Sequence, residues 1–177
     1  MSTLYQSFYD VSIRMPNNMA VVDCDGTLVR YQELIQQIDQ LSYAVLGQLK
    51  EDASPRVAVL MKSSIAQVAM VFALSRLNVV MVPLNPKLKD EQICHVLSST
   101  AAGFLIVEEE RLISCKHFAK VLSIEDLLNS SVKIASDIEN PSWREDETFL
   151  VTLSSGSTDD PKPIMLSEQS KLKRAQQ

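Results

Sequence analysis

An extended basic stripe, paired cysteines and long apolar runs are all missing from this sequence of 177 residues. The formal net charge is −5 and no basic stripe runs along the chain, which excludes an electrostatic case for nucleic-acid binding. No stretch reaches the roughly 18 consecutive apolar residues of a membrane span. The N-terminus has no basic start followed by an apolar run, so a signal peptide is not expected. We therefore expect a soluble, cytoplasmic protein without a membrane span.

The cysteines Cys24, Cys94 and Cys115 stand singly, and none has the C-x-x-C spacing that is typical of a metal or redox site. An odd number of isolated cysteines in a chain of intracellular character indicates buried thiols. The two histidines are equally isolated. His95 lies within an expected helix, where half-buried packing is the simplest interpretation, and His117 has no partner residues nearby in the sequence. The sequence therefore predicts no metal ligands.

Apolar residues make up 46% of the chain, and their spacing alternates between helical and strand patterns. From Tyr31 to Lys50 they recur every three or four positions, which predicts an amphipathic helix with one buried stripe. Short continuous apolar runs, separated by helical patterns, then favour an α/β fold with a mostly parallel sheet flanked by helices. The runs expected as neighbouring parallel strands are RVAVLM (56–61), NVVMVPL (78–84) and GFLIVEE (103–109).

The strand-like segment TFLVTL (148–153) leads directly into a loop that is rich in hydroxyl groups. Small side chains let the backbone curl so that several N–H groups point inward and form an anion-binding nest. Lys162 adds a mobile positive charge suited to terminal phosphate oxygens. The Walker pattern does not fit, because Pro161 and Pro163 flank this lysine. We predict a polyphosphate-binding loop, with a Ser-rich surface loop as the alternative on composition alone. The predicted phosphate ligands are Ser154, Ser155, Gly156, Ser157, Thr158 and Lys162.

The order of these residues resembles the [ST]-S-G-[ST]-T-G-x-P-K-G loop of adenylate-forming enzymes, which include acyl- and aryl-CoA ligases, luciferases and peptide-synthetase adenylation domains. Upstream, VRYQEL (29–34) resembles the family's T-Y-x-E-L segment, and LSRLNVVMVPLNP (74–86) is similar to its L-K-A-G-A-x-Y-V-P-L-D-P segment. The resemblance covers most of residues 20–168 and implies that residues 1–177 are part of the N-terminal domain of an AMP-binding ligase. The expected divisions are an α/β core at about 20–128, a polar connection at 129–147, a strand and phosphate loop at 148–168, and a truncated helix at 169–177.

The resemblance implies a two-step reaction that uses ATP and Mg²⁺. A carboxylic acid attacks the α-phosphate to give an acyl-adenylate and pyrophosphate, and a thiol acceptor, most simply coenzyme A, then takes the acyl group. The phosphate loop would hold the β- and γ-phosphates. Family members place their catalytic lysine, ribose-binding aspartate and metal-binding glutamate beyond this loop. The resemblance therefore implies no catalytic residue and no metal ligand within the 177 residues, and the fragment alone is expected to be inactive.

Three positions depart from the family pattern: Asp159 and Pro163 replace glycines, and Glu168 stands where many relatives have a histidine. Pro163 falls in the strand-like segment PIMLS. A carboxylate at position 159 would repel bound triphosphate, and Asp160 adds to that negative field. A degenerate loop of this kind leaves a non-catalytic binding or assembly module as an alternative function.

A second motif, VVDCDGTLV (21–29), matches the D-x-D-G-T opening of haloacid-dehalogenase-type phosphatases. In that interpretation Asp23 is the nucleophile, Asp25 the acid/base, and Mg²⁺ bridges them to phosphate, with Ser63 as the later hydroxyl residue. No suitable lysine and acidic pair follow in order. The simpler interpretation is a hairpin that turns at Asp25-Gly26 and leaves Asp23 solvated.

Overall fold

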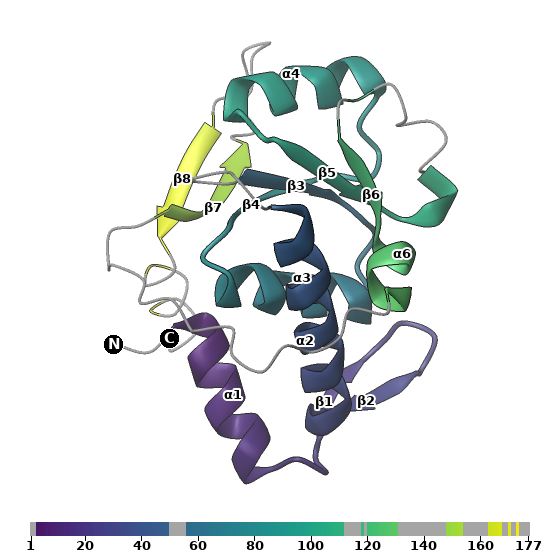
Figure 1. Ribbon diagram of the computed structural model, residues 1–177, viewed down its shortest axis with the longest axis vertical. Helices are drawn as coiled ribbons and strands as arrows, with labels where there is room; N and C mark the ends of the chain where they lie inside the picture. The colour runs from purple at the N-terminus through teal and green to yellow at the C-terminus, as the bar shows by residue number, and fades with distance from the viewer. Residues whose placement is uncertain are drawn as a thin grey trace.

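The computed structural model of this chain describes residues 3–49, 56–111, 118, 120–130, 148–153, 163–167, 170 and 173. Within them, a six-stranded sheet lies between helix α4 on one face and helices α1, α2 and α3 on the other (Figure 1). A separate two-stranded hairpin packs beside the N-terminal end of α2. This architecture confirms the α/β fold with a mostly parallel sheet that the sequence predicts.

The three predicted strands are neighbours at the centre of the sheet, whose strand order is β6-β5-β3-β4-β7-β8. β3 lies between β4 and β5 and is parallel to both, in an unbroken register from Arg56↔Val80 to Leu60↔Leu84 on the β4 side. β6 and β7 continue the parallel arrangement, and β8 alone runs antiparallel at the edge. The strands are β3 (Arg56–Leu60), β4 (Val80–Leu84), β5 (Phe104–Val107), β6 (Val121–Ser123), β7 (Thr148–Leu153) and β8 (Pro163–Ser167).

Alternate side chains of the central strands enter two separate apolar clusters. Val57 and Val59 face α1, α2, α3 and α6, whereas Ala58 and Leu60 face α4. Both faces of β3 are therefore buried, which explains why its sequence is continuously apolar rather than alternating. The helices are α1 (Leu4–Arg14), α2 (Tyr31–Gln48), α3 (Ile65–Arg76), α4 (Asp90–Thr100) and α6 (Ile124–Asn129).

Helix α2 confirms the predicted stripe: Leu34, Ile38 and Leu41 are each 0% exposed. The Glu33 carboxylate accepts a hydrogen bond from the Arg30 N–H at 2.7 Å, which satisfies a backbone donor at the helix start. At the start of α3, Ser64 is the N-cap residue, and its hydroxyl accepts a hydrogen bond from the Gln67 N–H at 3.2 Å.

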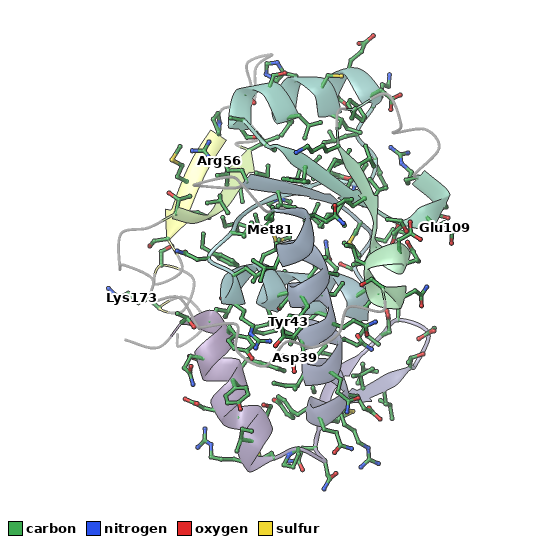
Figure 2. All side chains as sticks on the ribbon, viewed as in Figure 1. Asp39, Tyr43, Arg56, Met81, Glu109 and Lys173 are labelled. Atoms are coloured by element: carbon green, nitrogen blue, oxygen red, sulfur yellow. The ribbon has the colours of Figure 1, made fainter. Side chains whose placement is uncertain are left out.

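A polar cluster joins the three helices that cover this face. The Arg76 guanidinium forms an ion pair with Asp39 and lies over two rings, 5.1 Å from the centroid of Tyr5 and 5.9 Å from that of Tyr43. Figure 2 shows Asp39 and Tyr43 close together along α2. The Tyr5 N–H also donates to the Ser75 hydroxyl at 3.2 Å, and burial raises the pKa of Tyr5 to about 12. These contacts fix α1 against α2 and α3.

Two predictions about packing are wrong. Cys24 and Cys94 are exposed rather than buried, and His95 is exposed rather than half-buried. Cys24 lies in the hairpin turn, while Cys94 and His95 lie on the solvent side of α4, because that helix buries Ile93 and Val96 instead. Cys115 and His117 fall outside the described residues.

Candidate functional site

The predicted phosphate loop is framed by two paired strands. β7 and β8 form an antiparallel pair whose register runs from Thr148↔Ser167 to Leu153↔Pro163. The residues that precede and follow 154–162 therefore stand opposite each other, at the carboxyl end of a parallel strand. In open α/β sheets, ligands bind in the crevice outside the carboxyl ends of the strands. The hairpin thus places the ends of the loop where a ligand is expected.

β7 is firmly held in the sheet. Phe149 and Val151 are 2% and 1% exposed, and Leu150 pairs with Met81 of β4. Val151 belongs to the α4-side cluster, and Leu150 packs against the opposite one. β7 is therefore anchored on both faces of the sheet.

The residues predicted to bind phosphate lie within 154–162, outside the described part of the chain. The same holds for two of the departures from the family pattern, Asp159 and Glu168, and for the neighbouring Asp160. Their assignment therefore stays a prediction. The predicted phosphate ligands concerned are Ser154, Ser155, Gly156, Ser157, Thr158 and Lys162.

Pro163, by contrast, is described, and its position explains why it is tolerated. It is the first residue of β8, the edge strand of the sheet, and it is exposed. Proline cannot donate to a strand ladder, so within sheets it is confined to first positions, edges and bulges. The replacement of a glycine by Pro163 is therefore compatible with the hairpin.

Charged groups at the carboxyl ends of β3 and β5 pair with each other. Lys62 follows β3 and forms an ion pair with Glu110, and its backbone N–H donates to the Glu108 carboxylate at 3.2 Å. The hydrogen bond with Glu110 raises the pKa of Lys62, and the same contact lowers the pKa of Glu110. Sequence reasoning missed this pairing; its only signal is a lysine and a glutamate that each follow the end of a neighbouring strand.

The three glutamates that follow β5, residues 108–110, lie too far along the sheet to repel a phosphate bound at the β7–β8 hairpin. β5 and β7 are separated by β3 and β4, which at about 4.8 Å per strand spacing gives roughly 14 Å. The screening length at physiological salt is about 8 Å. Figure 2 shows Glu109 on the α6 side of the molecule, far from β8. Residues 108–110 are therefore too distant to repel a phosphate bound at this hairpin.

The structure does not favour the phosphatase interpretation of the VVDCDGTLV motif. β1 (Met19–Val22) and β2 (Leu28–Arg30) form a two-stranded hairpin outside the central sheet, with Gly26 in the turn at φ +87°. Asp25 accepts from the Thr27 N–H at 2.9 Å, a contact that lowers the pKa of its carboxyl. The nucleophile of that reaction needs a strand end in the main sheet, which this hairpin does not provide.

The sequence predicts a solvated Asp23, but the structure shows this residue half-buried. Its carboxylate is half-buried and accepts from the Cys24 N–H at 2.6 Å and from the Ile65 N–H at 3.3 Å. Ile65 is the first residue of α3, so this carboxylate supplements the Ser64 cap at a helix N-terminus, where negative charge is favoured. The role that the structure gives Asp23 is to join the hairpin to α3.

Metal sites and membrane spans are both missing from the described residues. No group of three or more His, Cys, Asp or Glu side chains among them is arranged to hold a metal ion. None of the helices in the described part of the chain is long and apolar enough to cross a membrane.

Comparison with known proteins decides the family. The model of the family described as AMP-binding enzyme matches residues 9–177. The chain belongs to this family. The match confirms the resemblance carried by the loop and by the two upstream segments.

Curated relatives of this AMP-binding chain include peptide synthases. Bacitracin synthase 3 from Bacillus licheniformis is 26% identical over 164 residues, covering 93% of this chain and 2% of that protein. Gramicidin S synthase 1 from Brevibacillus brevis is 25% identical over 167 residues, covering 93% of this chain and 15% of that protein. The chain therefore spans a small fraction of the length of the curated relatives it matches.

Solved structures of the same fold include N-terminal subdomains of adenylating enzymes. The Klebsiella oxytoca NpsA N-terminal subdomain in complex with 3-hydroxybenzoyl-AMSN has a TM-score of 0.79 at 26% identity, covering 95% of this chain and 41% of that chain. The Bacillus subtilis o-succinylbenzoate coenzyme A synthetase, MenE, in complex with AMP has a TM-score of 0.80 at 20% identity, covering 94% of this chain and 42% of that chain. At 20% identity the second likeness shows the fold alone.

Proposed function

We propose that this chain supplies the phosphate-binding part of an adenylating enzyme that joins a carboxylic acid to AMP. The observation that carries the proposal is the β7–β8 hairpin. Its register sets Leu153 opposite Pro163 at the carboxyl edge of a parallel sheet, and residues 154–162 are the segment that joins these two residues in a chain of the AMP-binding family. The loop sequence supplies the small residues, the hydroxyls and the lysine that a polyphosphate requires.

We further propose that the chain is one part of an N-terminal subdomain. It covers 41% of the NpsA subdomain in the 3-hydroxybenzoyl-AMSN complex, so the rest of an equivalent site would come from a longer protein. Residues 20–128 would then form the α/β core and residues 148–168 the strand and phosphate loop. Neither the phosphatase nor a non-catalytic assembly module is favoured by the relatives, which are synthases.

In the proposed reaction, a carboxylate oxygen attacks the α-phosphorus of ATP. A new P–O bond forms, the bond between the α-phosphorus and the bridging oxygen breaks, and pyrophosphate leaves with additional negative charge. No base is needed, because a carboxylic acid with a pKa near 4 is already ionised at neutral pH. The backbone N–H groups of residues 154–158 and the Lys162 ammonium would stabilise the leaving pyrophosphate. Mg²⁺ would neutralise part of the triphosphate charge, but the described residues contain no ligand set for it.

The acceptor in the second step would be a thiol. Structures of the same fold include a coenzyme A synthetase and an artificially fused adenylation–PCP di-domain of a peptide synthetase, so the fold alone does not choose between free coenzyme A and a carrier-bound thiol. The sequence relatives above are peptide synthases, and they favour a carrier-bound thiol over the coenzyme A suggested by the motif alone.

Asp159 should make the phosphate site weak. A like-charge contact near 4 Å costs on the order of 1 to 4 kcal/mol, depending on solvent exposure. Replacement of Asp159 by the family's glycine removes that charge and restores a residue that adopts positive φ angles without strain. Asp159→Gly is therefore expected to tighten binding of ATP and of pyrophosphate, most clearly at low salt.

Isothermal titration calorimetry of the 177-residue chain with ATP tests the proposal. Lys162→Ala should weaken binding by roughly ten- to a hundredfold, since a hydrogen bond to a charged group contributes roughly 1.5 to 3 kcal/mol. Arg14→Ala is the control, because it removes one positive charge from an exposed position at the C-terminal end of α1, outside the sheet. Equal effects of the two substitutions, or no ATP binding by either the wild type or Asp159→Gly, would refute the assignment of the loop.

A further inference from the structure

A cavity of about 310 Å³ opens between the last turns of α4, the start of β5 and the residues before β6. Leu97 and Ala102 line it from the α4 side, Leu105 from β5, and Phe118 from the segment before β6. It lies at the amino end of β5, whereas the phosphate loop follows the carboxyl end of β7. The cavity is therefore at the opposite end of the sheet from the proposed nucleotide site, and the inference below does not depend on that site.

The charge of the cavity is positive. Among the described residues that line it, Lys120 alone is charged, while Cys94 and Ser98 add a thiol and a hydroxyl. The Lys120 ammonium is held 4.7 Å from the ring centroid of Phe104, which is itself 5% exposed. A cation over an aromatic face is favoured electrostatically, so this contact keeps the ammonium beside the cavity.

The C-terminus of α4 works against an anion here, but only weakly. A helix end carries about half a negative charge, concentrated on its last carbonyl groups. Two of these are already satisfied: the Leu97 carbonyl accepts from the Ala102 N–H at 3.1 Å, and the Ser98 carbonyl accepts from the Ala101 N–H at 3.3 Å. The full charge of Lys120 therefore dominates.

We propose that this cavity binds a small amphipathic carboxylate, with the carboxylate beside Lys120 and an aryl or alkyl tail between Leu97 and Phe118. The volume sets the size of the ligand. At about 30 Å³ per water-sized group, the cavity holds a molecule of roughly ten non-hydrogen atoms. Apolar walls with a few fixed polar groups are the usual composition of such sites. Phenylacetate fits both the size and the charge.

The thiol of Cys94 can report whether the cavity is occupied. Cys94 lines it and is exposed, and Cys24 is exposed in the β1–β2 hairpin, so one molecule holds a test thiol and a control thiol. The 177-residue chain is treated with iodoacetamide, with and without phenylacetate, and the alkylation rate at each cysteine is followed by peptide mass spectrometry. Saturating phenylacetate should slow alkylation of Cys94 at least threefold and leave Cys24 unchanged. Phenylacetamide, the neutral analogue, should protect more weakly.

Two substitutions locate the binding. Lys120→Met keeps the apolar stem and should weaken phenylacetate about three- to fivefold, the size seen for solvent-exposed ion pairs. Lys87→Met removes the same charge from an exposed position near the other end of α4 and should change nothing. Ser98→Phe, at an exposed lining position, should fill the cavity and abolish protection while circular dichroism stays native. Failure of millimolar phenylacetate to protect Cys94, or equal protection by phenylacetamide, would overturn the proposal.

Discussion

The stability of the protein should depend strongly on one of the two ion pairs found in the described part of the chain and hardly on the other. Arg76 and Asp39 join α3 to α2 beneath α1, and their side chains are 12% and 33% exposed. Lys62 and Glu110 lie at the carboxyl edge of the sheet with side chains 64% and 60% exposed. Arg76→Met and Lys62→Met each remove one positive charge while they keep an unbranched apolar side chain.

The magnitude follows from burial. Loss of one partner from a fully buried pair costs about 3 to 5 kcal/mol, because the remaining charge is left uncompensated. Asp39 keeps about a third of its exposure, so we expect roughly half of that, and the two contacts of the guanidinium with tyrosine rings add about 1 kcal/mol in total. Arg76→Met should therefore lower the free energy of unfolding by about 3 kcal/mol, whereas Lys62→Met should be indistinguishable from the wild type.

Urea denaturation followed by far-UV circular dichroism measures both variants. A double-mutant cycle with Asp39→Ala separates the pair from the rest of the Arg76 side chain, and the coupling energy should exceed about 1 kcal/mol. Similar losses in Arg76→Met and Lys62→Met, or additive effects of Arg76→Met and Asp39→Ala, would refute the assignment of this pair as the main polar contact between the helices.

Three further outcomes are expected. Burial raises the pKa of Tyr5 to about 12, above its ordinary value of 10.0. The neutral phenol therefore stabilises the native state fully below pH 10, and this contribution is lost as the pH rises through 12. In urea titrations, Tyr5→Phe should reduce the alkaline loss of stability, and the substitution Tyr9→Phe at an exposed position should not. Asp23→Ala should lower the free energy of unfolding by about 0.5 to 1 kcal/mol, because the N-terminus of α3 loses a hydrogen-bond acceptor. Neither the wild type nor Asp23→Ala should hydrolyse a generic phosphate ester in the presence of Mg²⁺. Pro163→Gly should cost about 0.4 to 1 kcal/mol by loosening the unfolded chain, while hydrogen exchange shows β7 and β8 still paired.

The helices and strands that could be predicted from the sequence are those in which a long hydrophobic pattern shows which residues are buried. The α2 stripe recurs along a helix of 18 residues, so its buried face is unambiguous. After Arg56, β3 is apolar from Val57 to Leu60 because both of its faces are covered. α4 is half polar, and only Ile93, Val96 and Thr100 are buried along it. With so short a stripe, neighbouring positions such as Cys94 are assigned to the wrong side.

Contacts between distant segments could not be predicted. Asp23 meets the start of α3 across 42 residues of sequence, and Lys62 meets Glu108 across 46. Each depends on how separate elements pack, and neither partner carries a local signal. The predicted phosphate loop differs from these contacts, because its residue order is a distinctive local signal. Its position at the edge of the sheet could not be predicted, since this depends on the pairing of β7 with β8.

Because Leu153 and Pro163 are paired, the protein should tolerate sequence changes between them. The two ends of the loop are already brought together by the hairpin, so insertion or deletion between them costs little: doubling the length of a flexible loop costs only about 0.6 kcal/mol. If the proposed function holds, substitutions there, including one as unusual as Asp159, are expected to change phosphate affinity at little cost to the core. Libraries that vary residues 154–162 are therefore expected to sample phosphate affinity at a small cost in folding stability.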